Sequence, residues 1–313
     1  MVFTTIDQSL VPTTQSNILD NGGFEVWQRG TSFTNPAHFA YTTDRWRANF
    51  GSVPPSYTVT RESTIVDVGS IYSAKVAITA TSTPDDTRFF EQNMENATIY
   101  RNQTLTLSIR VNTTSSHIRI GIGDDSTYTP SATHPGDGQW HTLTVTKTIS
   151  GTTNGLSASV GFDVNTNVTN GTIIYVDNAV LTFGPNAATF VPLNSMIDLA
   201  RCQRFFEAFG AGAPPLGLPI YNNSANTAAF ADGIIMYKVT KRVNPAVTIT
   251  MTQVVLSLIP PGGGSPVTDT GAWSGVNDSG DLGCLAVQFQ RSGAVASARV
   301  GSFQFTFTAS ADL

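Results

Sequence analysis

The chain has 313 residues, which is enough for two domains that each bury a hydrophobic core. Only 12% of the residues are Asp, Glu, Lys or Arg, about half the usual share, whereas Gly, Thr, Ser and Asn are plentiful. This composition is typical of stable all-β proteins that are extracellular or carried on particles. The net charge of -5 and the lack of a basic stripe argue against a nucleic-acid-binding protein.

The segment from residue 17 to 192 consists of short alternating or β-branched runs separated by turn residues, which predicts an all-β sandwich. In LTLSIRV the apolar residues are Leu105, Leu107, Ile109 and Val111, so one face of that strand is expected to be buried. The predicted strands are 56–63, 73–81, 103–112, 117–123, 139–149, 156–164 and 172–183.

The rest of the chain predicts an arm, a helix and a second β-domain. Residues 1–16 are polar and contain Pro12, which favours an extended N-terminal arm. SMIDLARCQRFFEAF, residues 195–209, predicts the short connecting helix, within a helix and linker region of 193–217. Residues 218–313 return to strand patterns, which predict a C-terminal β-sandwich domain. We expect no secretory signal, disulfide framework or membrane insertion.

Several stretches resemble bacteriophage tail-fibre and other virion-surface proteins: NILDNGGFEVWQRGTSF, TTDRW (42–46), RCQRFFEAF (201–209) and the C-terminal ASARVGSFQFTFTASADL. Residues 17–192 also resemble a carbohydrate-binding-module jelly roll, which opens on N-G-x-F-E, here Asn21 to Glu25. Such a jelly roll closes on V-D-N/D-x-x-L, here Val176 to Leu181.

This resemblance implies a non-enzymatic virion structural protein on the phage particle surface, made in the bacterial host cytoplasm. It further implies a homotrimer, a tail-fibre-like or receptor-binding component that contacts a host-surface glycan. Because only about sixteen residues precede the jelly roll, without a long shaft, residues 1–16 are expected to dock onto another virion protein. The alternative is a capsid decoration or cement protein, a head fibre that stabilises the capsid.

Glu25 and Asp177 are expected on the first and last strands of the jelly roll, side by side. In carbohydrate-binding modules of this shape such a pair resembles a structural calcium site, and hard carboxylate oxygens suit Ca2+. The alternative is that Glu25 accepts hydrogen bonds from turn amides of Asp20 to Gly23 and that Asp177 caps a turn. Both alternatives are structural, and no other cofactor is expected.

The loop GDDSTYTPSATHPGDG, residues 123–138, is the candidate for carbohydrate binding. Asp124, Asp125 and Tyr128 would offer exposed acceptors and an aromatic ring to sugar hydroxyls, and a merely solvated loop is the alternative. Trp27, Trp46 and Trp140 are expected to pack in the core.

The sequence contains no motif that indicates a catalytic site, since GxSxG, HExxH, P-loop and dinucleotide fingerprints are all missing. Glu91 and Glu95 could face one cleft, which keeps a carbohydrate-active enzyme as a second alternative. The histidines, at 38, 117, 134 and 141, are scattered in the sequence. On the predicted helix, Phe205 or Phe206 could be buried where three copies meet about a threefold axis, or could simply pack between the domains.

Overall fold

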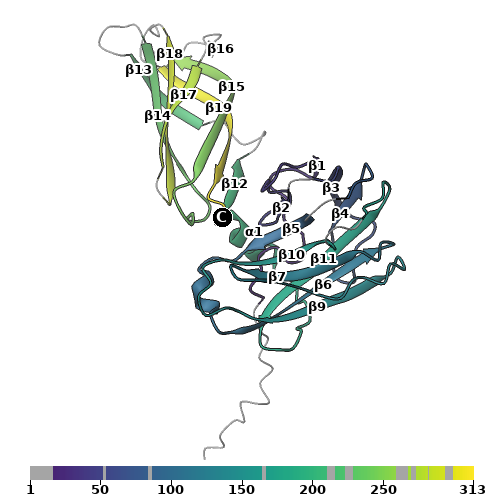
Figure 1. The fold of residues 1–313 in the computed structure, drawn as a ribbon. Coiled ribbons are helices and arrows are strands. Elements are labelled where there is room, and N and C mark those ends of the chain that lie inside the picture. Colours follow the sequence, from purple (N-terminus) through teal and green to yellow (C-terminus); the bar gives the residue numbers. More distant parts are fainter. Residues whose placement is uncertain are drawn as a thin grey trace, which may run out of the picture. The chain divides into compact units, whose positions relative to one another are not determined.

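The computed structural model describes residues 17–51, 54–83, 87–163, 167–209, 216–222, 228–258, 267–268, 273–280, 282–292 and 299–313. The predicted arm, residues 1–16, lies outside these ranges. The chain divides into two compact units, Met1–Ser195 and Met196–Leu313. Nearly all of their regular structure is strand (Figure 1), which confirms the predicted all-β fold class. Within the described ranges, no helix is long and apolar enough to cross a membrane.

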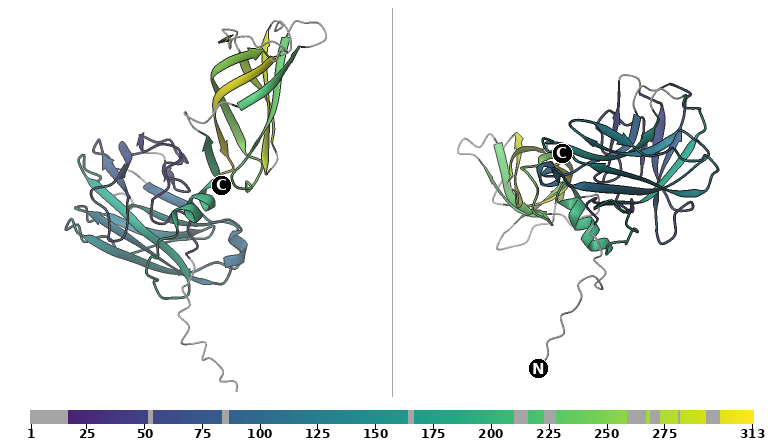
Figure 2. Two further views of the ribbon diagram at one scale, coloured as in Figure 1. Left: turned by 180° about the vertical axis from the view of Figure 1, so that it is seen from behind. Right: turned by 60° about the horizontal axis from the view of Figure 1, so that its bottom comes forward.

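The first unit consists of two antiparallel sheets (Figures 1 and 2). The six-stranded sheet contains, in spatial order, β1 (Ser32–Thr34), β3 (Tyr57–Glu62), β4 (Ser73–Ile78), β11 (Ile173–Phe183), β6 (Thr104–Thr113) and β9 (Trp140–Thr148). The five-stranded sheet contains β2 (Arg47–Phe50), β5 (Thr87–Asn93), β10 (Leu156–Phe162), β7 (Ile118–Asp124) and β8 (Tyr128–Pro130). A 3-10 helix, η2 (Ala97–Tyr100), follows β5.

The apolar faces of these sheets form one hydrophobic core. The alternation in β6 has the predicted effect, since Leu105, Leu107, Ile109 and Val111 are all fully buried. In the other sheet, Ile118, Ile120 and Ile122 of β7 are also fully buried. A strand with period-two alternation buries one face and leaves the other for polar residues.

The NGGFEVWQRG stretch is a compact turn rather than a strand, because β1 begins only at Ser32. The buried Asn21 amide donates to the Val26 carbonyl at 3.0 Å and to the Asp44 carbonyl at 2.9 Å, which ties the stretch to TTDRW. Trp46 is fully buried, and its ring stacks on Phe24 with centroids 5.0 Å apart. The two quoted motifs therefore form one structural element.

The same turn lies along β11. The Ile18 amide donates to the Leu181 carbonyl at 2.9 Å, and the Ala179 amide donates to Gly22 at 2.7 Å. A Cβ at Gly22 would lie 2.3 Å from the Ala179 carbonyl oxygen, so only glycine allows this approach. The expectation that the start of the domain lies beside its last strand is thus confirmed for residues 18–22, although those residues are not a strand.

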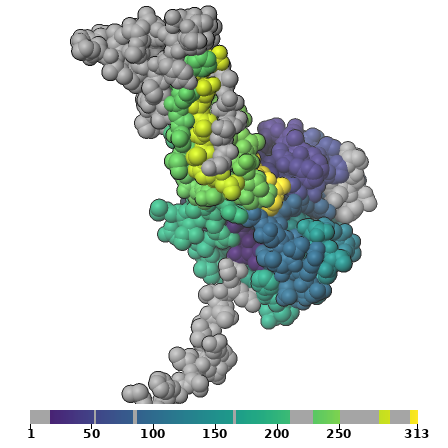
Figure 3. All heavy atoms as spheres, turned by 90° about the vertical axis from the view of Figure 1, so that its left-hand side faces the viewer, coloured from purple at the N-terminus to yellow at the C-terminus, as the bar shows by residue number. Residues whose placement is uncertain are grey.

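The second unit is an antiparallel sheet, eight-stranded within the described residues. Its order is β16 (Val267–Thr268), β15 (Ala246–Leu258), β19 (Arg299–Ser310), β13 (Leu216–Asn222), β14 (Ala228–Met236), β18 (Cys284–Ser292) and β17 (Trp273–Gly280), with β12 (Phe206–Phe209) paired to β19. In the space-filling view, yellow residues from the C-terminal part of the chain lie beside green residues of the same unit (Figure 3).

The predicted helix of 195–209 is too long, because the observed helix α1 (Ser195–Gln203) ends six residues earlier and residues 206–209 are strand β12. Phe206 pairs with Ser310 and Phe209 with Phe307, so RCQRFFEAF and the C-terminal TFTASADL lie side by side. Pairing with β19 satisfies the backbone of this Phe-rich stretch, and tertiary context overrides helix propensity.

Phe205 lies in the turn before β12 and Phe206 begins that strand, and both are buried. Phe205 and Phe206 therefore do not lie on a helical face. The predicted contact between three copies stays a prediction.

Candidate functional site

The side of the five-stranded sheet that faces away from the core carries only polar, glycine or proline residues at its paired positions. Residues paired directly across antiparallel strands point to the same face. Three such rows cross the sheet from β2 or β5 toward β8: Arg47, Glu91, Ser159, Gly121 and Pro130; Asn93, Ser157, Gly123 and Tyr128; and Asn49, Arg88, Gly161 and Arg119. We call this surface the outer face.

Glu91 holds one part of the outer face together. Its Oε1 accepts from Arg47 at 3.0 and 3.3 Å, and its Oε2 accepts from Asn49 at 2.8 Å and from Arg88 at 3.2 Å. The carboxylate is 4% exposed, whereas the Arg47 and Arg88 side chains are 13% and 20% exposed. One buried anion thus orients two guanidinium groups that water still reaches.

Tyr128 reaches inward from β8 over the glycine positions. A Cβ at Gly121 would lie 2.1 Å from the Tyr128 hydroxyl, so the missing side chain makes room for the ring. The hydroxyl lies 3.1 Å from Ser159 Oγ, and the Arg88 guanidinium lies 4.7 Å from the ring centroid. Tyr128, predicted as a sugar-binding residue, therefore lies on the outer face and is half-buried.

A second aromatic group lies next to β2. The Arg47 guanidinium is 4.4 Å from the centroid of Phe39, whose side chain is 47% exposed. At the other end of the face, Arg119 pairs with Asp163 at 2.7 Å. Sequence reasoning missed Arg47, Arg88 and Phe39. The signal that could have found the face is the alternation of Ser or Gly with apolar residues in IRIGIG and LSASVGF.

The prediction of Asp124 as an exposed acceptor was wrong. Its side chain is 1% exposed, and its carboxylate accepts from the amides of Ser126, Thr127 and Ser150 at 2.8 to 3.0 Å. Although burial by itself raises the pKa of this carboxyl, the hydrogen bonds from these amides and the charge of Lys147 together bring it below the ordinary value. Asp124 is a turn clamp and is closed to a ligand.

Asp125 is exposed, as predicted, but its carboxylate also accepts backbone hydrogen bonds. Oδ2 accepts from Asn154 at 2.6 Å and from Gly155 at 3.0 Å. These bonds join the loop after β7 to the loop before β10. Its role toward a sugar stays a prediction.

Glu25 and Asp177 hold the same loop from two sides. Glu25 Oε1 accepts from the amides of Ile71 and Tyr72 at 2.8 and 3.3 Å. Asp177 Oδ2 accepts from the Asp67 amide at 3.1 Å. The side chain of Asp67 in turn accepts from Arg110 at 2.8 and 3.0 Å. Both predicted residues are therefore backbone clamps of residues 67–72.

Asp177 is fully buried, and burial raises the pKa of its carboxyl to about 7, with the nearby Asp67 carboxylate adding to the rise. Its oxygens accept backbone hydrogen bonds from Asp67 at 3.1 Å and from Asn178 at 2.7 Å, and the Ser70 side chain also hydrogen-bonds to the carboxylate. A buried carboxylate is a type of ligand that a hard cation such as Ca2+ prefers. Glu25 and Asp177 would hold that ion, and the calcium site stays a prediction.

The tryptophans divide between core and surface. Trp27 and Trp46 are buried, which confirms their assignment to the core. Trp140 is half-buried on the row Trp140, Asn112 and Tyr175 of the six-stranded sheet, so it does not belong to the core.

No family model matches the chain, and no curated protein does. Solved carbohydrate-binding modules resemble it. One is the C-terminal family 22 carbohydrate-binding module of Clostridium thermocellum Xyn10B, with 15% identity, a TM-score of 0.34, and 51% of this chain and 98% of that chain covered. Another is a putative sugar binding protein from Bacteroides thetaiotaomicron, with 9% identity, a TM-score of 0.35, and 54% and 100% covered. These identities are too low to carry a function to this chain.

Proposed function

We propose that the first unit binds carbohydrate on the outer face of its five-stranded sheet and does so as a non-enzymatic binding module. The observation that carries this proposal is the set of three rows, in which every outward position is polar, glycine or proline across five strands. An ordinary solvated sheet face would not need guanidinium groups pre-oriented by a buried Glu91.

The chemistry of the face suits sugar hydroxyls. Guanidinium, amide and hydroxyl groups offer donors and acceptors in fixed directions, and aromatic rings offer flat apolar surface. Glycine and serine occupy the middle of the face, while Tyr128 and Phe39 lie toward its two sides. Neighbouring strands are about 4.8 Å apart, so the face spans about 19 Å from β2 to β8. That width suits an oligosaccharide better than a single sugar ring.

The state of Glu91 supports binding over hydrolysis. A glycosidase needs one carboxyl that can donate a proton and a second carboxyl at a defined distance. Both oxygens of Glu91 accept from cationic or amide donors, and the side chain is nearly inaccessible. The Asp125 carboxylate accepts hydrogen bonds from two backbone amides.

We further propose that this module is displayed on a phage particle as a homotrimer that contacts a host-surface glycan, on the strength of the motif resemblance. Imaging of particles with labelled protein, together with its copy number, tests the location. Hundreds of copies would indicate capsid decoration, and a few tens would indicate the tail. The solution mass tests the trimer, and a mass of one chain would refute it.

The binding test uses the whole chain against a panel of neutral and acidic polysaccharides in affinity electrophoresis and calorimetry. Tyr128→Ala and Arg119→Ala should each weaken binding about 10- to 100-fold, since one hydrogen bond to a charged group contributes about 1.5–3 kcal/mol. Tyr175→Ala, on the opposite sheet, is the matched control and should bind normally.

Absence of binding to every polysaccharide and to host cells would refute the proposal. Equal losses in Tyr128→Ala and Tyr175→Ala would place the site elsewhere. Depolymerisation of a bound polysaccharide would show that the chain is an enzyme rather than a binding module.

A further inference from the structure

A cluster of two histidines and an aspartate lies near the start of β9, in the first unit. His134 and Asp137 belong to the loop between β8 and β9, and His141 is the second residue of β9. One potential ligand atom from each residue lies within 4.8 Å of the other two, and among the described residues no other such group of three is found. Although the histidines are scattered in the sequence, the fold therefore brings two of them together.

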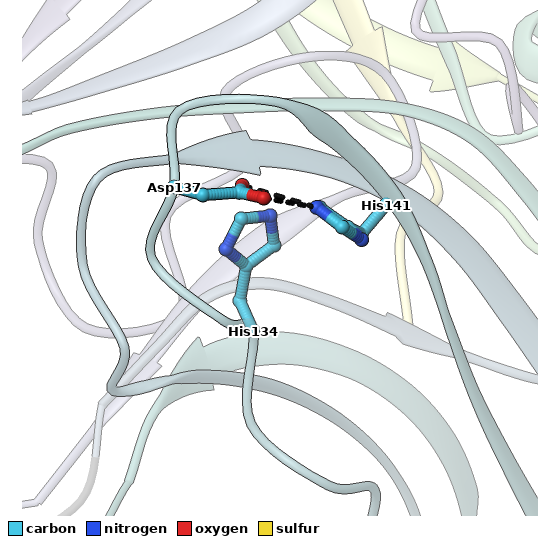
Figure 4. A group of neighbouring side chains, drawn as sticks. All are labelled: His134, Asp137 and His141. Atoms are coloured by element: carbon cyan, nitrogen blue, oxygen red, sulfur yellow. Dashed lines mark hydrogen bonds and ion pairs between the residues drawn. The ribbon is translucent and has the colours of Figure 1, made fainter.

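Asp137 and His141 form the outer pair of the cluster. His141 Nε2 lies 2.9 and 3.0 Å from the two carboxylate oxygens of Asp137. The His134 ring is perpendicular to that of His141, with centroids 4.9 Å apart. Figure 4 shows the His134 imidazole turned toward the Asp137 carboxylate and the His141 ring.

His134 is held in place as the inner member. It is fully buried, its amide donates to the Ile118 carbonyl at 2.7 Å, and Nδ1 accepts from the Gly136 amide at 2.9 Å. Nε2 lies 3.2 Å from the carbonyls of Val111 and Gln139. Gly136 has a φ of +78°, and a Cβ there would lie 2.9 Å from the Ser116 amide nitrogen. The loop is thus built around His134 and requires glycine.

We propose that His134, Asp137 and His141 bind one divalent transition-metal ion of the Zn2+ class. Two imidazole nitrogens and one carboxylate oxygen are ligands that Zn2+, Ni2+ and Cu2+ prefer over Ca2+ or Mg2+. Ligands of a tetrahedral zinc ion lie about 3.4 Å from one another. The three side chains must therefore draw closer to surround an ion, and the Gly136 amide must release His134 Nδ1. Three protein ligands leave a fourth position for water or an external ligand.

Both imidazoles bind through Nε2 and keep their remaining proton on Nδ1. In His134 the proton therefore moves from Nε2 to Nδ1, and the Gly136 amide releases Nδ1 and turns toward solvent. Any proton beyond one per imidazole leaves to solvent. Binding thus changes the surroundings of the Gly136 amide, which gives a signal that a nonspecific surface ion would not produce.

The test uses the whole chain without a histidine tag, freed of metal by a chelator and titrated with Zn2+ in a calorimeter. We expect one ion per chain, and a shift of the Gly136 amide resonance on binding. His141→Ala and Asp137→Asn, both outside the core, should lower the affinity at least about tenfold. His117→Ala, an exposed histidine outside the cluster, should bind like the native chain. Co2+ in place of Zn2+ should give the visible absorption of a tetrahedral site.

Absence of binding below about 1 mM, a free energy near 4 kcal/mol, would overturn the proposal. The same affinity in His141→Ala as in the native chain would also overturn it. Circular dichroism of the metal-free variants checks that they fold. If a variant does not fold, the shift of the Gly136 amide resonance and the Co2+ absorption of the native chain show whether the ion binds at this cluster.

Discussion

Replacing Glu91 by Gln tests whether this carboxylate organises the outer face. The change keeps the shape of the side chain but removes the charge between Arg47 and Arg88. The amide retains one acceptor oxygen, so about two charge-assisted hydrogen bonds are lost, which is about 3–6 kcal/mol before relaxation. Water reaches both arginines, which are 13% and 20% exposed. The net destabilisation is therefore about 3 kcal/mol.

The assay is calorimetric melting of the whole chain, read in the transition of the first unit. A loss of about 3 kcal/mol in a unit of this size corresponds to a decrease in Tm of about 6–12 °C. Asp163→Asn is the matched control, because it makes the same chemical change beside Arg119, but its side chain is 32% exposed. That control should lower Tm by no more than about 4 °C, since exposed ion pairs contribute about 0–1 kcal/mol.

Equal Tm changes in the two variants would refute the organising role of Glu91. A second outcome would refute it in another way. If Glu91→Gln kept the native Tm and abolished hydrolysis of a polysaccharide, the carboxylate would be catalytic and the face would be an active site.

Three further predictions concern charges elsewhere. Lys241→Met should destabilise the second unit by about 3–5 kcal/mol in denaturant unfolding, because it leaves the Glu207 carboxylate, 2.7 Å away, buried without its cation. Lys238 is exposed, so Lys238→Met should change the stability little. Equal losses in the two variants would contradict the role of the Lys241–Glu207 pair. Asp124→Asn should cost about 1–3 kcal/mol near neutral pH. Because the folded pKa of Asp124 is lowered, its stabilisation is present above the unfolded value and lost as pH falls, so the difference from the native chain should shrink in acid; a constant difference would count against it. Ca2+ should raise the Tm of the chelated native chain and not of Asp177→Asn, and an unchanged native Tm would end the calcium prediction.

Local patterns predicted much of the first unit, because the alternation of apolar and polar residues within a single strand indicates which face of that strand is buried. In LTLSIRV four apolar residues at a period of two indicate the strand and its inner face. TRFFEQN was missed as strand β5, because a register shift between Val160 and Gly161 lets both Phe89 and Phe90 point inward. A bulge of this kind breaks the alternation that sequence reading relies on.

RCQRFFEAF shows a second limit of predicting secondary structure from local patterns. Its residues have a helical spacing and an acceptable helix propensity, but its last four residues pair with β19, about a hundred residues later. Propensity differences within such a short stretch are small compared with the backbone hydrogen bonds and burial gained from strand pairing.

Short-range alternation and turn residues were enough to predict the all-β class, most strands of the first unit and the burial of Trp27 and Trp46. The jelly-roll resemblance, rather than any local pattern, predicted that the start of the domain lies beside β11. No local pattern indicates that Glu91 lies between two arginines, that His134 lies beside Asp137 and His141, or that the Asp124 carboxylate is buried. Such properties depend on strand register and loop packing, which bring together side chains that no local spacing connects.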